Sequence, residues 1–268
     1  MTFREKERGM RKKKQEALLL IPAYNEELNI LPLLEKLKEE KVTEYADILV
    51  INDASVDRTK EFVQSAGVER IDNLYHLGYG SSLKVGYNYA LEKGYLYVIQ
   101  MDGDGQHDVC NVKPIYEALC REVNGKCPDI VLGSRFLQQN QGFSMKNMAI
   151  GLFRWAIRVG TGKTITDPTS GLQGLCRRTF VYYATSGYFD DSYPDANMIM
   201  QMLLLGYEVT EIPALMHKRE HGKSMHSGLR PFIYMNRMLF SMLAVWIRSR
   251  LLRKRSRKAL GEKKKDSR

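Results

Sequence analysis

Residues 95–108 read YLYVIQMDGDGQHD, an apolar run that ends in three acidic residues and a histidine. The aromatic and β-branched side chains of 95–100 predict a buried strand. Carboxylates gathered at a strand end repel one another unless a cation or hydrogen-bond donors offset their charge. Hard divalent cations bind carboxylate oxygens and often share them with substrate phosphates. We therefore predict a metal site at Asp102, Asp104 and Gln106; the alternative is a turn whose aspartates cap backbone amides.

Short apolar runs alternate with amphipathic segments on both sides of this strand. The predicted strands lie at 17–21, 47–51, 68–74, 95–100, 129–132 and 208–212. The predicted helices lie at 28–41, 59–66, 81–93, 112–123, 143–159 and 197–205. This alternation indicates the α/β class, with a mostly parallel sheet and helices on both of its faces.

Polar residues follow five of the predicted strands. They occupy positions 22–26, 52–57, 76–80, 102–104 and 133–135. The carboxyl ends of parallel strands meet at one edge of a sheet, and ligands bind in the crevice outside that edge. The sequence therefore predicts a single ligand-binding site built from these five loops.

Six motifs occur in order over about residues 17–240: IPAYNEE, INDASVDRT, QMDGDGQHD, VLGSRF, DPTSGLQG and REHGKS. Together they resemble the family-2 glycosyltransferases, which have the GT-A (Rossmann-like) fold. More narrowly, they resemble the polyprenyl-phosphate branch, of which dolichyl-phosphate mannose synthase is the familiar member. The resemblance implies a hexosyltransferase that uses Mg²⁺ or Mn²⁺. It would move a sugar, with inversion, from a nucleotide-diphosphate donor, expected to be a UDP-sugar, to a polyprenyl (undecaprenyl or dolichyl) phosphate.

The resemblance also implies how the loops bind the donor, with the Asp102 loop on the diphosphate. On the nucleoside side the implied residues are Pro22, Ala23, Tyr24 and Glu26, with Glu26 on the ribose, and Asp53 against the base. Two departures from the family pattern affect these loops. The third loop begins with His76 where the family usually has asparagine, which leaves the role of that loop open. The second loop reads Asn52-Asp53 rather than two acids.

For the reacting groups, the resemblance places Arg135 on the acceptor or donor phosphate, and Asp167 and Ser170 beside the sugar. Arg219 and Lys223 would belong to a basic loop that closes over the diphosphate. These residue types suit the reaction, because breaking the sugar–phosphate bond leaves negative charge on the departing diphosphate. A divalent cation and arginine stabilise that charge as it develops. The alternative for the basic loop is a solvated surface turn.

The nature of the acceptor depends on whether the reaction needs a base. A sugar hydroxyl needs one, whereas a lipid phosphate is already anionic near neutral pH. Asp167 and Asp195 are the candidate bases, but Asp195 precedes a predicted helix and could equally be its N-cap. The DPTSG motif and the C-terminus favour the phosphate acceptor. The alternatives are transfer to a sugar hydroxyl in cell-surface polysaccharide assembly, and a catalytically silent nucleotide-binding subunit of a membrane complex.

The charge of the chain is concentrated at its ends. The formal net charge is +10, yet residues 15–247 carry 23 basic against 27 acidic residues. We divide the chain into a basic tail at 1–16, a GT-A catalytic domain at 17–230 and an amphipathic, basic segment at 231–268. An acidic body with basic ends argues against a nucleic-acid partner and favours an anionic membrane surface. Solvated tails without a partner are the alternative.

The C-terminal segment has an apolar stretch at 238–247 followed by eleven basic residues in 248–268. Ten residues cannot span a bilayer, so a helix over 232–252 is expected to lie in the membrane interface or to pack on the domain or on a small membrane protein. The four cysteines form no CxxC pair, which is typical of reduced thiols in the cytoplasm. We expect a cytoplasmic protein held at the inner face of the membrane, with a homo-oligomer left open.

Overall fold

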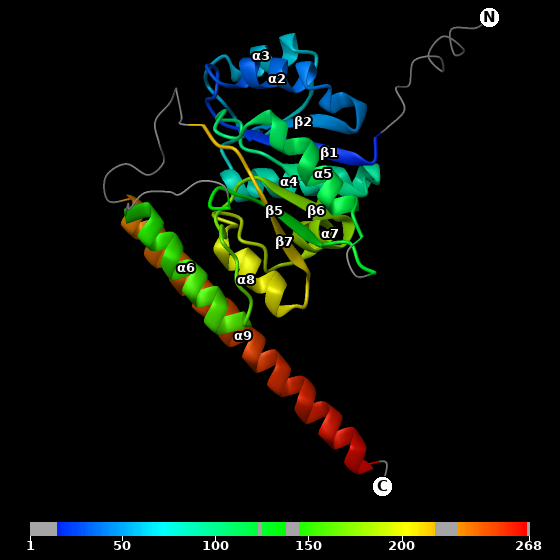
Figure 1. Ribbon diagram of the computed structural model, residues 1–268, viewed down its shortest axis with the longest axis vertical. Helices are drawn as coiled ribbons and strands as arrows, with labels where there is room; N and C mark the ends of the chain where they lie inside the picture. The colour runs from blue at the N-terminus through cyan, green and yellow to red at the C-terminus, as the bar shows by residue number, and fades with distance from the viewer. Residues whose placement is uncertain (1–14, 123–124, 138–144, 218–229, 267–268) are drawn as a thin grey trace, which may run out of the picture.

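The computed structural model describes residues 15–122, 125–137, 145–217 and 230–266. Its seven-stranded sheet has the order β3-β2-β1-β4-β6-β5-β7, and β6 is antiparallel to both of its neighbours (Figure 1). The strands are β1 (Ala17–Ala23), β2 (Ala46–Asn52), β3 (Glu69–Asp72), β4 (Tyr97–Gln100), β5 (Ile130–Ser134), β6 (Gln173–Cys176) and β7 (Val209–Pro213). The expected mostly parallel sheet is confirmed.

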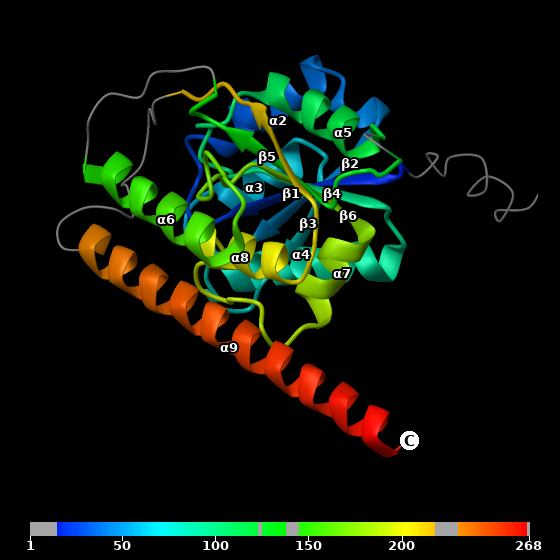
Figure 2. The ribbon, with the colours of Figure 1, turned by 60° about the horizontal axis from the view of Figure 1, so that its bottom comes forward.

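Helices cover both faces of the sheet (Figure 2). One face packs against α2 (Ile30–Glu39), α3 (Thr59–Ser65) and α5 (Val112–Cys120). On the other face α4 (Tyr79–Lys93) and α7 (Arg177–Thr185) contact the strands, and α6 (Met145–Thr161), α8 (Ala196–Leu204) and α9 (Arg230–Asp266) pack together in the same core cluster. Two short 3₁₀ helices, η1 (Val42–Glu44) and η2 (Val109–Asn111), complete the described elements.

Strand β1 explains why an entirely apolar run forms the centre of the molecule. Leu18 and Leu20 belong to the core under α4, and Leu19 and Ile21 belong to the core under α2. All four are 0 or 1% exposed. Successive side chains of a strand point to opposite faces, so a strand covered by helices on both faces is apolar at every position.

Two local expectations were wrong. The first strand was expected to end before Pro22, but β1 runs through Ala23. Pairing with β4 stops at Leu20, so at Pro22 the strand has a partner on one side only, where a missing N–H is tolerated. The sequence reading also missed β6 and α7. The four residues of β6 have no strong strand pattern of their own and are buried because they insert between β4 and β5.

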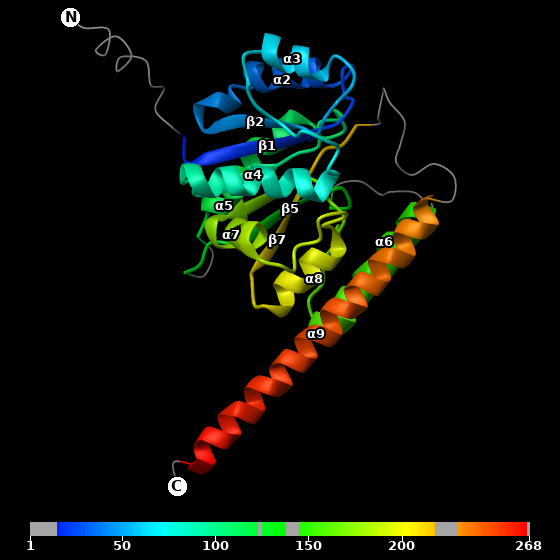
Figure 3. The same cartoon turned by 180° about the vertical axis from the view of Figure 1, so that it is seen from behind.

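The helices α6 and α9 lie side by side along one flank of the domain (Figures 1 and 3). The C-terminal half of α9 projects beyond the body. On its inner face, Met238, Met242 and Val245 are buried against the domain. Among the described residues, no helix combines the length and the apolar character that crossing a membrane requires.

Candidate active site

Asp102 lies directly after β4, where polar loops from several strands meet. The Tyr79 hydroxyl donates to its Oδ1 at 2.9 Å, and His107 Nε2 lies 3.6 Å from its Oδ2. Burial alone would raise the pKa of Asp102, but interactions with His107 and Tyr79 outweigh burial and lower the pKa below its ordinary value. The carboxylate is therefore charged, as a cation ligand must be.

The neighbouring residues of the acidic loop shape the turn. Asp104 Oδ1 accepts a hydrogen bond from the backbone N–H of Gln106 at 3.0 Å, across Gly105 at φ +73°. The backbone N–H of His217 donates to the Gln106 carbonyl at 2.8 Å, so the loop is tied to the segment after β7. Asp104 thus caps a turn, as the alternative interpretation expected, while remaining two residues from Asp102.

The sequence pattern assigned no role to His107 or Asp108 beyond the turn, yet both side chains stabilise this loop. His107 is only 4% exposed and stands against Asp102. Asp108 accepts from His217 Nε2 at 2.6 Å and from the backbone N–H of Cys110 at 2.8 Å. Burial opposes its charge, but these donors hold the pKa of Asp108 at about 2. The contact with His217 could not be predicted from the sequence, because His217 comes from the segment after β7.

Asp53, expected to contact the base, is 3% exposed and organises the loop after β3. Its Oδ1 accepts from Asn73 Nδ2 at 2.8 Å and from the N–H of Leu77 at 2.9 Å. Its Oδ2 accepts from the N–H of Gly78 at 2.8 Å and lies 2.8 Å from His76 Nδ1. Four donors surround this carboxylate, so in the structure Asp53 stabilises the 76–80 loop through hydrogen bonds and an ion pair.

The other nucleoside candidates lie at the end of β1, next to the loop that Asp53 holds. Pro22 and Ala23 are buried in β1, and Tyr24 is 42% exposed. The Tyr24 ring stacks on His76 with centroids 3.9 Å apart. Glu26 is partly buried; its N–H donates to Thr59 and its Oε2 accepts from Asn29, at 2.8 and 2.6 Å. Tyr24 and His76 together offer an aromatic surface at the edge of the site.

Backbone strain is concentrated at the ends of β1 and β2. Asn25 has φ +54° and Ala54 has φ +58°, a conformation that residues with a β-carbon adopt only at a cost. Ser55 Oγ accepts from the N–H of Asn25, and Asn25 Oδ1 accepts from the N–H of Val56. These bonds link the first two loops, so the strained turns are held by each other.

Arg135 and Asp167 form a bidentate ion pair at the end of β5. Arg135 Nε donates to Oδ2 and Nη2 donates to Oδ1, both at 2.7 Å, and the backbone N–H of Arg135 also donates to Oδ2 at 3.1 Å. Asp167 is 0% exposed. Burial opposes the charge of Arg135, but Asp167 outweighs it and raises the pKa of Arg135. Asp167, expected as a candidate base, therefore uses both of its oxygens to orient Arg135.

Ser170, expected beside the sugar, is buried within the sheet junction. Its hydroxyl donates to the Gly133 carbonyl at 2.6 Å, which joins the DPTSG loop to β5. Next to it, Gly171 packs against Asp102. A β-carbon added to Gly171 would overlap Oδ2 of Asp102 and lie 2.9 Å from its Cγ. The backbone of the DPTSG loop therefore packs against the loop that carries Asp102.

Asp195 occupies the N-cap position of α8, but its side chain makes no capping hydrogen bond. Its Oδ2 instead accepts from the Tyr234 hydroxyl of α9 at 2.7 Å. Burial raises the pKa of Asp195 to about 6; the Tyr234 hydroxyl opposes the shift, and Asp102 and Asp190 add to it. A carboxyl with this pKa, near Asp102, has the properties of a general base.

Arg154 of α6 is a site residue that the sequence reading missed. Its Nε and Nη2 are buried and have no hydrogen-bond partner among the described residues. Its guanidinium lies over the Phe136 ring at 4.0 Å. Burial lowers the pKa of Arg154, and the charges of Asp167 and Glu211 counter that shift. Buried donors without a partner are uncommon in folded proteins, which singles out this arginine. The expected lid residues Arg219 and Lys223 lie outside the described residues.

Comparisons with known proteins identify the family of the chain. Residues 19–178 match the model of glycosyl transferase family 2. The chain belongs to this family. An undecaprenyl-phosphate mannosyltransferase of Micrococcus luteus is 28% identical over 79% of this chain and 87% of its own length. A dolichyl-phosphate beta-glucosyltransferase of Trichomonas vaginalis is 24% identical over 79% of this chain and 68% of its own.

Solved structures of other glycosyltransferases share the fold. Glucosyl-3-phosphoglycerate synthase from Mycobacterium tuberculosis is 17% identical, with a TM-score of 0.64 over 87% of this chain and 80% of that chain. A second structure of that synthase, in complex with Mn²⁺, uridine diphosphate and glucosyl-3-phosphoglycerate, gives a TM-score of 0.61 at 15% identity. This family-2 glycosyltransferase therefore has the GT-A fold, as the motifs implied.

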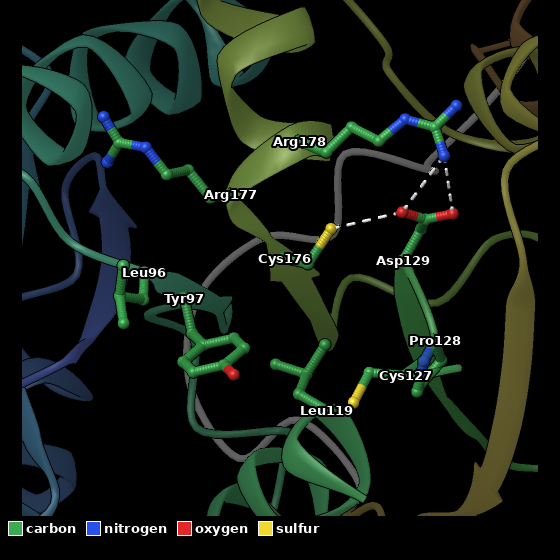
Figure 4. A pocket seen from close by; sticks show the side chains of 9 residues that line it. All are labelled: Leu96, Tyr97, Leu119, Cys127, Pro128, Asp129, Cys176, Arg177 and Arg178. Carbon is green, nitrogen blue, oxygen red and sulfur yellow. Dashed lines mark hydrogen bonds and ion pairs between the residues drawn. The ribbon is translucent and has the colours of Figure 1, made fainter. Parts of the chain in front are cut away.

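A separate pocket of about 310 Å³ lies at the opposite end of the sheet (Figure 4). It opens where β4 and β5 begin and is lined in part by Tyr97, Cys127 and Cys176. The Cys176 thiol lies 3.4 Å from Asp129, which Arg178 also contacts. None of the predicted site residues lines this pocket, so the polar strand ends and this hollow are distinct.

Proposed function

We propose that this family-2 glycosyltransferase moves one sugar, with inversion, from a nucleotide-diphosphate donor to a polyprenyl phosphate at a membrane surface. The named relatives that act on undecaprenyl or dolichyl phosphate support the acceptor. The observation that carries the proposal is Arg154, a guanidinium with two buried, unused donors beside the Arg135–Asp167 pair. An incoming phosphate would satisfy those donors.

On the donor side, Asp102 and Asp104 would hold a divalent cation together with diphosphate oxygens. The charged state of Asp102 fits this role, and among the described residues no cluster of three or more acidic, histidine or cysteine side chains would hold a metal alone. When bound, the cation would neutralise charge on the departing diphosphate. The Mn²⁺ and uridine diphosphate in the synthase complex make Mn²⁺ and a UDP-sugar the first reagents to test.

On the acceptor side, the protein would position an anion rather than remove a proton. A phosphate monoester is already negatively charged near pH 7, with a second pKa of about 6. Arg135 is fixed by both oxygens of Asp167, so it can present a further N–H without reorienting. Arg154 would approach from α6. Two arginines from different elements would thus offset the repulsion between the acceptor and the donor diphosphate.

One observation supports the alternative of a sugar hydroxyl as acceptor. Asp195 has a pKa raised to about 6 and is close enough to Asp102 for their charges to interact. A hydroxyl acceptor needs a base of this kind. The two acceptors differ in what they require: a phosphate needs Arg154, whereas a hydroxyl needs Asp195.

The surface formed by α6 and α9 supports action at a membrane. Trp155 and Val159 of α6 are 61 and 63% exposed, and Phe240 and Leu243 of α9 are 71 and 51% exposed. These helices lie side by side, and α9 leads into the basic C-terminus. Apolar side chains beside many arginines and lysines suit the interface of an anionic bilayer. We infer a peripheral location on the cytoplasmic face.

The test is transfer of labelled sugar from a panel of UDP- and GDP-sugars to undecaprenyl phosphate in anionic vesicles, with Mn²⁺ or Mg²⁺. We expect label in the organic phase after lipid extraction, and a loss of at least about a hundredfold in Arg154→Ala with Asp195→Asn much less affected. Label found only on soluble sugar acceptors, with Asp195→Asn inactive, would overturn the phosphate acceptor in favour of the hydroxyl.

A further inference from the structure

The inner face of α9 contacts the α8 segment through polar residues spaced seven apart. The Tyr234 hydroxyl donates to Asp195 at 2.7 Å, and one heptad later Ser241 Oγ accepts from Asn197 Nδ2 at 2.8 Å. A third contact, from Arg248 to Gln201, follows after another seven residues. Two helical turns separate these positions, so all three point to the same side of α9. The helix is therefore held in a defined register.

Tyr234 is itself fixed by aromatic contacts from two other segments. Its ring packs edge-on against Phe153 of α6, with centroids 6.3 Å apart, and against Tyr193, with centroids 5.5 Å apart. Edge-to-face pairs at such distances are favourable and set the direction of the ring. The hydroxyl is thus aimed at Asp195 by packing as well as by its hydrogen bond.

Asp195 stands among charged and titratable groups from every side of the site. Two carboxylates and one guanidinium shift the pKa of Asp195 by their charges. The charge of Asp195 in turn raises the pKa of the Tyr79 hydroxyl of α4. In order of the chain these groups are Tyr79, Asp102, Arg135, Asp190 and Tyr234. Of those in the α8–α9 region, Tyr234 is the one that donates a hydrogen bond to the Asp195 carboxylate.

We propose that Tyr234 is a positioning residue for the reaction, because it holds the Asp195 carboxylate in the site from α9. The helix would then belong to the catalytic unit as well as to the membrane surface, and seating α9 on a bilayer would stabilise the arrangement of the site. For its effect on turnover, this inference rests on the alternative given under the proposed function, a sugar hydroxyl as acceptor, for which Asp195 is the base. The contact itself is independent of any substrate.

The direct test is the titration of Asp195 by ¹³C NMR of carboxyl-labelled aspartate, with its signal assigned by Asp195→Asn. A hydrogen bond to the ionised form lowers an acid's pKa, so its loss in Tyr234→Phe should raise the pKa of Asp195 by about one unit. Ser241→Ala is the matched control, since it removes the equivalent contact one heptad further along and does not touch Asp195. We expect this control to titrate like the wild type.

The second test is the pH profile of sugar transfer. In Tyr234→Phe, the fall in turnover on the acid side should move to higher pH by the same amount, while the apparent KM for the nucleotide sugar changes less than twofold. An unchanged Asp195 titration in Tyr234→Phe, or an acid limb matching that of Ser241→Ala, would overturn the proposal. If no transfer is found in the wild type, the proposed function fails, but the NMR titration still decides whether Tyr234 controls Asp195.

Discussion

Gly171 of the DPTSG loop packs directly against the carboxylate of Asp102, with no room for a β-carbon between them. Asp102 follows β4 and Gly171 precedes β6, the antiparallel strand that pairs with β4. Insertion of β6 next to β4 is thus what brings the two motifs together. The glycine has no side chain, and this leaves the space that the Asp102 carboxylate occupies.

Gly171→Ala tests this spacing. The new methyl group would overlap Oδ2 of Asp102, so the carboxylate must move, and we expect turnover to fall by about tenfold to a hundredfold. Stability should fall by about 1–3 kcal/mol. Gly187→Ala is the control, because nothing lies within 4 Å of its added β-carbon. Steady-state kinetics and thermal unfolding of both variants provide the measurement. Equal activity of Gly171→Ala and Gly187→Ala would contradict the close packing of Gly171 on Asp102.

Asp102→Asn tests the metal site. Removing the charge should weaken binding of Mn²⁺ and nucleotide together and reduce turnover by about a hundredfold or more. The fold should persist, since an amide can still accept from the Tyr79 hydroxyl. Calorimetric titration with UDP and Mn²⁺ provides the measurement. The control is Asp108→Asn, which alters an acid six residues away whose partners are His217 and Cys110. Similar UDP and Mn²⁺ affinities in both variants would refute the assignment.

Arg135→Lys tests the ion pair with Asp167. Lysine keeps the charge but lacks the planar fork that donates to both oxygens, so the buried Asp167 carboxylate loses one of its two charged hydrogen bonds. We expect a loss of about 1–3 kcal/mol in the free energy of unfolding, measured with urea. Arg178→Lys, in a pair whose arginine is 57% exposed, should cost less than about 1 kcal/mol.

Asp195→Asn should make stability less dependent on pH. The folded protein holds the Asp195 proton up to about pH 6, whereas the unfolded chain releases it near pH 4, so wild-type stability declines as pH rises through this window. Because Asp195 is partly exposed, we expect the variant to be more stable by only about 1–2 kcal/mol at pH 8, and no different below pH 4. Thermal unfolding across pH, with the exposed Asp191→Asn as control, measures the difference.

The α6–α9 surface can be tested by vesicle sedimentation. Phe240→Ser combined with Leu243→Ser removes two exposed apolar side chains and should reduce binding to anionic vesicles by at least about tenfold. Leu28→Ser with Leu74→Ser removes comparable exposed residues elsewhere and should leave binding unchanged. Raising the salt concentration should weaken binding in all variants, because the basic C-terminus is screened. Equal binding by the two double variants would place the lipid contact elsewhere.

Local patterns predicted most of the framework. Strands such as 17–21 and 47–51 are buried on both faces, and a strand buried in this way is recognisable because almost every one of its residues is apolar. The polar loops at the carboxyl ends followed from parallel pairing. The strand β6 escaped prediction because four residues with little apolar content become a strand only when both neighbours are already in place.

The sequence by itself determined the family, most of the strands and helices, and the placement of Asp102 at a strand end, since each depends on residues close together in the chain. Only the tertiary structure decided what the site residues touch. It set Gly171 against Asp102, gave Asp167 to Arg135 and joined Asp195 to Tyr234 of α9. These partners lie 32 to 69 residues apart in sequence, and no local pattern encodes which side chains packing will bring within hydrogen-bond distance.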